Sequence, residues 1–304
     1  MLKINICFSK FYCGIFYTGK NDMYYCNKNK IPKVITALIL IAVLFSNLQS
    51  QPLSLKGQIG EFISAEAFSI SDNRFIYVTD SETNEVYKLT MSGEVTQYIG
   101  GYGWSEGAFD NPVDIFAGTL NVYVTDKNND RIQFLDKDLN YISEFSSRRI
   151  DNPQYGFRYP TSAVISPIGD LFILDSDNSR ILKFDFSGKF SLEVGSYDAG
   201  SFMLNNPIKF DISSDSRLFV LDDDEIKVFD QFGGGLNRIK IKSRAKNLHI
   251  KSDIICLTYN DSVELLDLQN PSKGFITYAI DSENILKDGF VFQDQLFILT
   301  EKMI

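Results

Sequence analysis

The stretch Tyr123-Val124-Thr125-Asp126 is a short apolar strand pattern that ends in aspartate, and it recurs along the chain. Three further close copies are Tyr77-Val78-Thr79-Asp80, Phe172-Ile173-Leu174-Asp175 and Phe219-Val220-Leu221-Asp222, and two weaker ones are Cys256-Leu257-Thr258 and Phe297-Ile298-Leu299-Thr300. The four aspartates are 46, 49 and 47 residues apart, and the next two steps are 36 and 42 residues. A period of about 20–50 residues indicates a chain built by repeating one supersecondary unit.

Each repeat contains four short strand patterns in the same order. An apolar strand such as Val113–Phe116 precedes the aspartate-ended strand, a polar hairpin and an alternating third strand follow it, and a fourth strand such as Val95–Ile99 completes the unit. Short strands separated by Gly, Asn and Asp turns indicate an all-β protein, and four strands per repeat describe one blade of a β-propeller. The six copies predict a six-bladed β-propeller of four-stranded antiparallel blades over residues 51–304.

The links between repeats are also similar to one another. Phe109, Phe157 and Phe202 each follow a glycine and precede a proline that comes just before the next inner strand, so we expect these rings to pack between blades. Leu53–Ile59 resembles a fourth strand and is expected to complete the last blade, whose predicted strands are Gly289–Phe292 and Gln295–Thr300. No third strand follows before Ile304, so the last blade either has three strands or belongs to an incomplete reading frame.

The hairpins carry a more specific signal. Asp126, Asn129, Arg131 and Ile132 have the same spacing as Asp175, Asn178, Arg180 and Ile181. This pattern resembles the NHL-repeat family of β-propellers over residues 60–300, strongly in the second and third repeats and weakly after residue 240. The resemblance implies that the repeated Asp, Asn and Arg are structural, since hairpin Asp and Asn side chains bond to nearby backbone.

The N-terminal region predicts export. Residues 34–45 form an apolar run that follows Lys28, Lys30 and Lys33 and precedes a polar stretch, as in a secretory signal peptide. We expect residues 1–50 to be an extension plus signal peptide cleaved after Ser50, with Met23 as an alternative start. The mature protein would be periplasmic, on the cell surface or secreted, and an uncleaved N-terminal membrane anchor is the alternative. Cys256 would be its one cysteine, a buried and unreactive thiol.

Charge limits the classes of partner. Of the total net charge of −9, the first 50 residues carry +5, so the remainder carries −14. An acidic body repels phosphate backbones and anionic lipid surfaces, which argues against nucleic acid and against membrane insertion after cleavage. We expect a monomer that binds a protein or a small molecule.

Few residues suggest catalysis. His249 is the chain's one histidine and falls on a predicted inner strand, where Asp114 and Asp211 could join it around a metal in the central channel. Metal sites with histidine usually need two or three such ligands or several carboxylates, so no metal or other cofactor is the first expectation. Calcium stays open, with the four carboxylates of Asp222–Glu225 as the simplest cation site and a solvated hairpin as the alternative.

Two inter-blade loops are candidate binding surfaces. One contains Tyr102 and Trp104, flanked by glycines, and the other contains Arg148, Arg149, Tyr155 and Arg158. Exposed Trp, Tyr and Arg are the residue types that dominate binding energy, although Trp104 could equally seal a blade interface. The leading hypothesis is an exported, non-enzymatic propeller that serves as a protein- or ligand-binding scaffold. The alternative is a metal-dependent, lactonase-like propeller hydrolase or lyase with its site in the channel.

Overall fold

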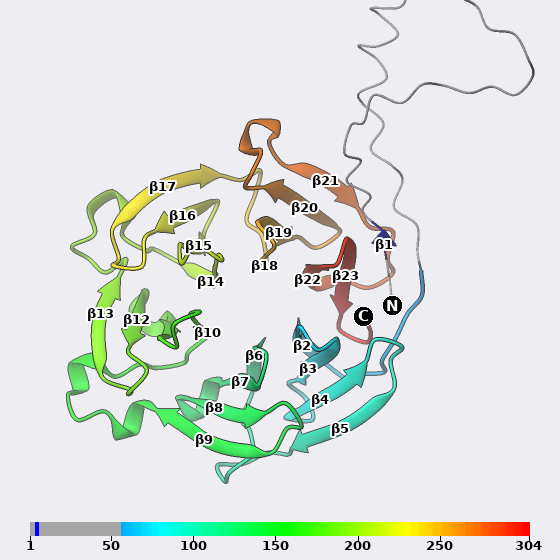
Figure 1. Ribbon diagram of the computed structural model, residues 1–304, viewed down its shortest axis with the longest axis horizontal. Helices are drawn as coiled ribbons and strands as arrows, with labels where there is room; N and C mark the ends of the chain where they lie inside the picture. Colours follow the sequence, from blue (N-terminus) through cyan, green and yellow to red (C-terminus); the bar gives the residue numbers. More distant parts are fainter. Residues whose placement is uncertain (1–3, 6–55) are drawn as a thin grey trace, which may run out of the picture.

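The computed structural model describes residues 4–5 and 56–304, which form a ring of antiparallel sheets around a central axis (Figure 1). The predicted signal peptide, the cleavage position after Ser50 and the start of the expected closing strand at Leu53 lie outside the described residues. Within residues 4–5 and 56–304, no helix is long and apolar enough to cross a membrane.

Five sheets have four strands each, and each is a blade whose first strand is innermost. The first blade contains β2 (Ala65–Ile70), β3 (Phe75–Asp80), β4 (Glu85–Thr90) and β5 (Val95–Gly100). The second contains β6 (Pro112–Ala117), β7 (Asn121–Asp126), β8 (Arg131–Asp136) and β9 (Tyr141–Ser146). The third contains β10 (Ser162–Ile165), β11 (Leu171–Asp175), β12 (Arg180–Phe184) and β13 (Phe190–Val194). The fourth contains β14 (Pro207–Ile212), β15 (Leu218–Asp222), β16 (Glu225–Phe229) and β17 (Gly235–Lys240). The fifth contains β18 (Asn247–Lys251), β19 (Ile254–Thr258), β20 (Ser262–Asp267) and β21 (Ile276–Ala279).

A hairpin of β22 (Leu286–Phe292) and β23 (Gln295–Thr300) closes the ring between the fifth and first blades. It forms a three-stranded sheet with the dipeptide strand β1 (Ile4–Asn5), whereas the sequence predicted a sixth blade completed by Leu53–Ile59. Residues 56–64 contain no strand, but they do pair with the segment after β23: Ile59 and Ile304 exchange two backbone hydrogen bonds of 3.0 Å each. The predicted closure is therefore present as irregular backbone in the described part of this segment.

Short 3-10 turns lie between the strands. They are η2 (Lys127–Asn129), η3 (Ser147–Arg149), η4 (Pro153–Tyr155), η5 (Ser176–Asn178), η6 (Gly200–Phe202) and η7 (Pro271–Lys273). Two of them follow an aspartate-ended strand and are closed by Asp130 or Ser179 in the left-handed region. These turns explain why the hairpins of the second and third blades share a spacing that the sequence shows.

The core lies between neighbouring blades. β11 is buried at every position, whereas β5 and β17 at the rim are mostly exposed, so burial decreases from the axis outward. Phe109 is buried among apolar residues of the first and second blades, and Phe157 among those of the second and third. The prediction that the link phenylalanines pack between blades is confirmed at both positions, and Phe202 is partly buried against the core between the third and fourth blades.

The repeated aspartates bind the links to the blades. Asp126 accepts hydrogen bonds from the backbone N–H of Asp110 at 2.8 Å, from Asn129 Nδ2 at 2.9 Å and from Arg131 Nε at 2.7 Å. Asp175 accepts the equivalent three from Arg158, Asn178 and Arg180. In the fourth blade Glu225 occupies the ladder position of the arginine, and Lys227, two residues further on, lies 2.6 Å from Asp222 instead. These contacts confirm the structural role that the sequence implied for the repeated side chains.

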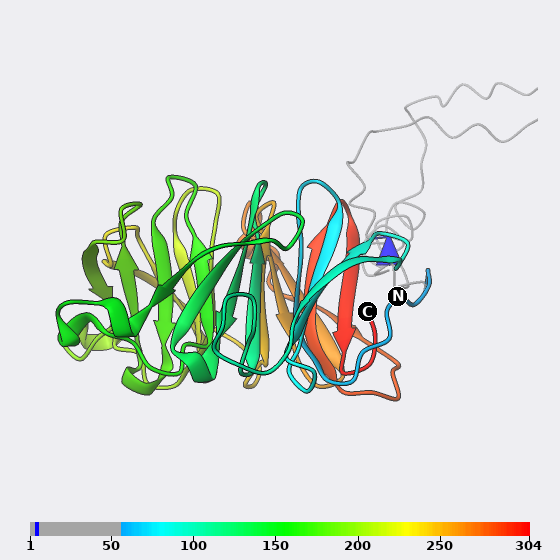
Figure 2. The ribbon, with the colours of Figure 1, turned by 90° about the horizontal axis from the view of Figure 1, so that it is seen from below.

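Seen edge-on, the ring is a disc with loops on two faces (Figure 2). The inner strands begin on the face that carries the inter-blade links and end on the face that carries the inner hairpins. Two cavities lie along the axis, one at each face, and we call them the wide cavity and the narrow cavity.

Candidate functional site

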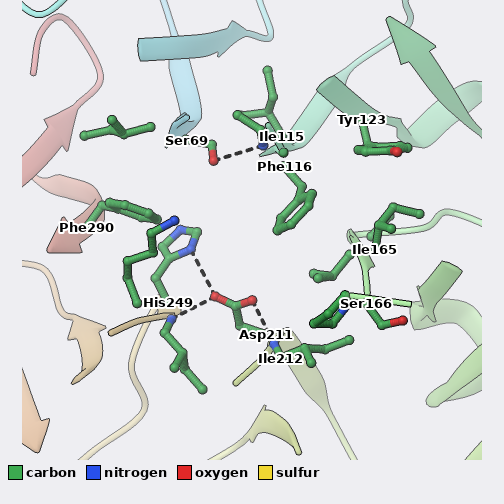
Figure 3. Close-up of a pocket in the computed structure, with 18 of the residues that line it drawn as sticks. Ser69, Ile115, Phe116, Tyr123, Ile165, Ser166, Asp211, Ile212, His249 and Phe290 are labelled. Carbon is green, nitrogen blue, oxygen red and sulfur yellow. Dashed lines mark hydrogen bonds and ion pairs between the residues drawn. The ribbon is translucent and has the colours of Figure 1, made fainter. Parts of the chain in front are cut away.

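The wide cavity has a volume of about 690 Å³ and lies where the inner strands end. Residues from the inner strands of all five blades and from β22 line it, so no single repeat could form it alone. Figure 3 shows the labelled side chains arranged around the open space: Ser69, Ile115, Phe116, Tyr123, Ile165, Ser166, Asp211, Ile212, His249 and Phe290.

Its walls are mostly apolar. Ile115 and Phe116 come from β6, Ile165 from β10 and Ile212 from β14, and Phe290 from β22 lies against His249 with ring centroids 5.2 Å apart. A few charged side chains of the inner strands lie among these apolar ones. Cavities of this size and composition are typical of small-molecule sites.

One ion pair crosses the channel at the base of the wide cavity. Lys209 from β14 contacts Asp114 from β6 across β10, and both side chains are buried. Asp114 also accepts a hydrogen bond from the backbone N–H of Ile115 at 2.8 Å. Breaking a buried pair by removing one partner leaves an uncompensated charge, so the two residues hold each other in place.

His249 forms the centre of a second charged group. Its Nε2 lies 3.1 Å from both carboxylate oxygens of Asp288 on β22, and its Nδ1 lies 3.7 Å from Asp211 Oδ2 on β14 (Figure 3 shows the Asp211 contact). Burial of the ring disfavours its charged form, but the charge of Asp288 and hydrogen bonds to Asp211 and Asp288 outweigh burial and raise the pKa of His249 to about 9. The ring is therefore protonated at neutral pH.

Backbone donors fix the two carboxylates. Asp211 accepts from the N–H groups of Ile212 and Ile250, each at 2.8 Å, and Asp288 accepts from Gly289 at 2.7 Å and Phe68 at 3.3 Å. These bonds join β14 to β18 and β22 to β2. The aspartates thus connect neighbouring inner strands around the axis as well as balancing the charge of His249.

The predicted channel set is brought together only in part. Asp211 lies beside His249, but Asp114 pairs with Lys209, and the carboxylate that bonds His249 most closely is Asp288. Among residues 4–5 and 56–304, no group of three His, Cys, Asp or Glu side chains is arranged to hold a metal ion. A histidine must lose its ring proton to bind a metal, and here two carboxylates favour keeping that proton.

Sequence reasoning missed Lys209 and Asp288. Both occupy inner-strand positions, and a signal existed: Asp114, Asp211 and Asp288 are acidic residues within mostly apolar inner strands, and each accepts a hydrogen bond from the next residue's backbone N–H. Aligning inner strands in the weak last repeat would have placed Asp288 with the others. Lys209 could not be paired with Asp114 from sequence, because 95 residues and a whole blade separate them.

The turn Asp222–Glu225, the simplest candidate cation site, forms ion pairs with basic side chains of its own blade. Asp222 pairs with Lys227, and Glu225 pairs with Arg238 at 2.8 Å. Asp223 accepts from Asn206 Nδ2 at 3.1 Å. The cluster therefore holds the fourth blade and its link together.

The structure joins the two predicted binding loops into one surface. The guanidinium carbon of Arg148 lies 4.0 Å from the ring centroid of Trp104, and Trp104 and Tyr102 are 54% and 74% exposed. Trp104 therefore does not seal the blade interface, a role that Phe109 fills. Arg131 positions the loop by donating to the Trp104 carbonyl at 2.9 Å.

The other predicted residues lie along the same link. Arg149 pairs with Glu144 at 2.8 Å, and Tyr155 stacks on Phe190 with ring centroids 3.7 Å apart. Arg158 lies over Tyr159, with its guanidinium carbon 5.5 Å from the ring centroid. The ring of Tyr155 therefore packs within the third blade, whereas Trp104 and Arg148 form an exposed pair.

Cys256 is buried, as predicted for a free thiol. Burial and the nearby Asp288 charge raise the pKa of its thiol well above the ordinary value. It therefore stays protonated and poorly nucleophilic at neutral pH.

No protein-family model and no curated protein sequence matches the chain. Solved structures do resemble it: a virginiamycin B lyase from Staphylococcus aureus has a TM-score of 0.56 and 16% identity, with 81% of each chain covered. A streptogramin B lyase has a TM-score of 0.58 and 14% identity over 81% of this chain and 80% of that chain. A chain of a nidogen–laminin complex has a TM-score of 0.58 and 16% identity over 71% of this chain and 81% of that chain. Identity this low shows the fold alone, and together with the ring of four-stranded blades it shows that the chain is a β-propeller.

Proposed function

We propose that this protein is a non-enzymatic binding propeller and that the wide cavity is its ligand site. The ligand is an organic molecule with an apolar body and one positively charged or hydrogen-bond-donating group. One observation carries the proposal: a cavity of about 690 Å³ has apolar walls above a base whose ionisable groups are already paired with one another. Paired groups at the bottom of the cavity can orient a ligand, but they leave no unpaired ionisable side chain of the described residues there to act as a general base or nucleophile.

The charge of the cavity supports the ligand class. Four carboxylates line it (Asp72, Asp114, Asp211 and Asp253), against two lysines and the protonated His249. The excess is negative, and a carboxylate has room for about four acceptor contacts. An ammonium group directed at Asp211 would gain a charge-assisted hydrogen bond, while the aromatic rings of Phe116 and Tyr123 would cover its apolar part.

The test uses simple probes of opposite charge. Phenethylammonium, its neutral analogue 2-phenylethanol and the anion hydrocinnamate are titrated against the purified protein by calorimetry. We expect the cation to bind most tightly, and Ile165→Trp, which fills the cavity, to abolish binding. Ile142→Trp on the exposed rim strand β9 serves as the matched control. Equal binding of all three probes, or unchanged binding by Ile165→Trp, would refute the proposal.

The competing function is a metal-dependent hydrolase or lyase with its site in the channel. The observation that favours it is the buried His249 beside two carboxylates, because strongly perturbed pKa values are common at catalytic sites. Metal analysis after dialysis separates the two functions. Stoichiometric calcium or zinc that survives dialysis, and that His249→Gln removes, would favour the enzyme over the binding propeller.

The Trp104–Arg148 pair supports a second binding role. We propose that Tyr102, Trp104 and Arg148 contact a protein partner with an acidic segment, since an exposed aromatic with an adjacent arginine is typical of interface hot spots. A partner recovered from an envelope extract should lose affinity for Trp104→Ala and keep it for Phe186→Ala, which removes an exposed ring from an outer hairpin of the third blade. Loss with both variants would contradict the assignment.

Several broader properties are proposed with the function. The Asp-Asn-Arg hairpins support an NHL-type propeller, and the β22–β23 hairpin, which lies where a sixth blade would lie, supports a sixth and incomplete blade. The acidic composition supports a protein that binds neither nucleic acid nor anionic membranes. Export through the predicted signal peptide and a monomeric state complete the proposal, and retention on heparin or a dimer in light scattering would count against it.

A further inference from the structure

We propose that the narrow cavity is a separate site for a small organic carboxylate. It has a volume of about 310 Å³ and lies where the inner strands begin, on the opposite side of the Asp114–Lys209 pair from the wide cavity. Its lining is mostly polar and consists of Glu66, Val113, Thr161, Ile208, Lys209, Lys246, Asn247 and Lys287. Three lysines around one cavity are unusual in a protein body with a net charge of −14.

Lys246 differs from the other two lysines of the narrow cavity in its ion pairing. Lys209 is neutralised by Asp114, and Lys287 lies 3.2 Å from Glu66 Oε1. Lys246 has no carboxylate within ion-pair distance among residues 4–5 and 56–304, and its ammonium donates only to the Leu286 carbonyl at 3.3 Å. Burial and the neighbouring Lys287 lower its pKa. Lys246 is therefore the one lysine of this cavity without an ion pair in the described chain, although Glu66 also acts on its charge.

Unpaired hydrogen-bonding groups lie beside it. Asn247 is 9% exposed; its Oδ1 accepts from the Leu248 N–H at 2.8 Å, and its amide Nδ2 donates to no other group in the described chain. The Thr161 hydroxyl is buried and has no hydrogen-bond partner there. Of the two, the Thr161 hydroxyl is the buried group without a partner, and the Asn247 amide is a second donor, so a ligand oxygen at this position would give both groups a partner.

These groups fit a carboxylate monoanion better than a phosphate. One ammonium balances one negative charge, and the Asn247 amide can donate to the second carboxylate oxygen. A phosphate dianion would leave a negative charge uncompensated next to Glu66. The cavity volume, at the lower end for ligand sites, suits a short organic acid.

The experiment titrates ¹⁵N-labelled protein with propionate, propionamide and inorganic phosphate at constant ionic strength and follows the side-chain amide of Asn247 by NMR. We expect saturable shifts with propionate, weaker ones with phosphate and none with the neutral amide. Lys246→Met should weaken propionate binding at least about tenfold, since a charged hydrogen bond contributes about 1.5–3 kcal/mol. Lys137→Met, which removes an exposed lysine paired with Asp138 in the outer hairpin of the second blade, should bind propionate like the wild type.

Two results would overturn the site. Propionate binding that is unchanged in Lys246→Met would remove the proposed charge contact, and phosphate binding that exceeds propionate binding would overturn the carboxylate class. Both results are measured without a ligand for the wide cavity, and the phenethylammonium titration and the Ile165→Trp variant report on that cavity separately.

Discussion

At the scale of single residues, two aspartates of the second blade have similar sequence settings and different structural roles. Asp126 ends β7, is fully buried and bonds the link, the hairpin and Arg131. Asp136 ends β8 and bonds the backbone N–H groups of Asp138 and Asn140 within its own exposed turn. Sequence alone shows both as strand-ending aspartates, and only burial separates them.

We predict that Asp126→Ala lowers the free energy of unfolding by about 2–4 kcal/mol, because it leaves the Asp110 N–H and the buried Nε of Arg131 without their acceptor, at about 1–3 kcal/mol each. Arg131 keeps its second carboxylate, Glu144, at 2.7 Å. Asp136→Ala is the matched control and should cost only about 1 kcal/mol, since its hydrogen bonds lie in a solvated turn. Urea unfolding of both variants measures the difference. Similar losses for the two would contradict the role assigned to the repeated aspartate.

His249 should make stability depend on pH. Its pKa is about 9 in the folded protein against 6.5 in the unfolded chain, so its contribution is fully present below about pH 6.5 and is lost as pH rises through about 9. The loss should be about 3 kcal/mol, given about 1.4 kcal/mol per pKa unit. The charged groups that act on the ring are Asp211 and Lys209 from β14 and Asp288 from β22. Cys256 lies opposite His249 in the β18–β19 ladder.

The measurement is the unfolding free energy at several pH values between 6 and 10, for the wild type and for His249→Gln. The variant should be less stable at low pH and should show a flatter curve between pH 6.5 and 9. The comparison uses slopes, so a general destabilisation of the variant does not affect it. Parallel curves would show that His249 is not the titrating group.

At the scale of elements, the exposed Trp104 link and η3 meet through one cation–π contact. Trp104 is the chain's single tryptophan, so fluorescence reports this contact alone. We expect iodide to quench the emission more than caesium does, because the Arg148 cation attracts the anion. Arg148→Gln should reduce that preference, whereas Arg217→Gln, which removes a guanidinium over Phe219, should not. Equal quenching in wild type and Arg148→Gln would mean that the contact is absent in solution.

The elements show how far sequence could predict the fold and the site. The aspartate-ended strands and the link phenylalanines were predictable because their spacing repeats, and each depends on contacts within one blade or with its neighbour. The meeting of Arg148 with Trp104, and of Lys209 with Asp114, depends on loop conformation and on contacts across the ring. No local pattern encodes such contacts, so the candidate site could be predicted only as isolated residues.

The closing segment departed from prediction for a related reason. The alternating apolar residues of Leu53–Ile59 fit a strand, yet the described part of this segment pairs with Ile304 through two backbone bonds and otherwise runs irregularly to Phe62. The β22–β23 hairpin already packs against the neighbouring inner strands β18 and β2. Composition does not specify which segment pairs with which strand, so the sequence could not predict how residues 56–59 would pair.

At the scale of the whole molecule, stability should depend on how the ends of the ring meet. Ile304 is 1% exposed and packs in the core cluster that contains Phe62, Phe68 and Phe290. We predict that Ile304→Ala costs about 2–5 kcal/mol, as for other buried large-to-small changes. Ile276→Ala on the exposed strand β21 should cost less than about 1 kcal/mol. Thermal unfolding compares them, and equal midpoints would show that the ring does not rely on this contact.

Lys209 lines both axial cavities, so the two mouths of the propeller share one side chain. A ligand in one cavity that displaces the Lys209 ammonium must alter ligand affinity in the other cavity. Each ligand must then change the binding free energy of the other by the same amount. The affinity of the wide cavity for a cation would then depend on whether an anion occupies the narrow cavity, and the reverse, because both ligands act on the ammonium of Lys209. Titrating phenethylammonium with and without saturating propionate would measure that coupling, and Lys209→Met should abolish it.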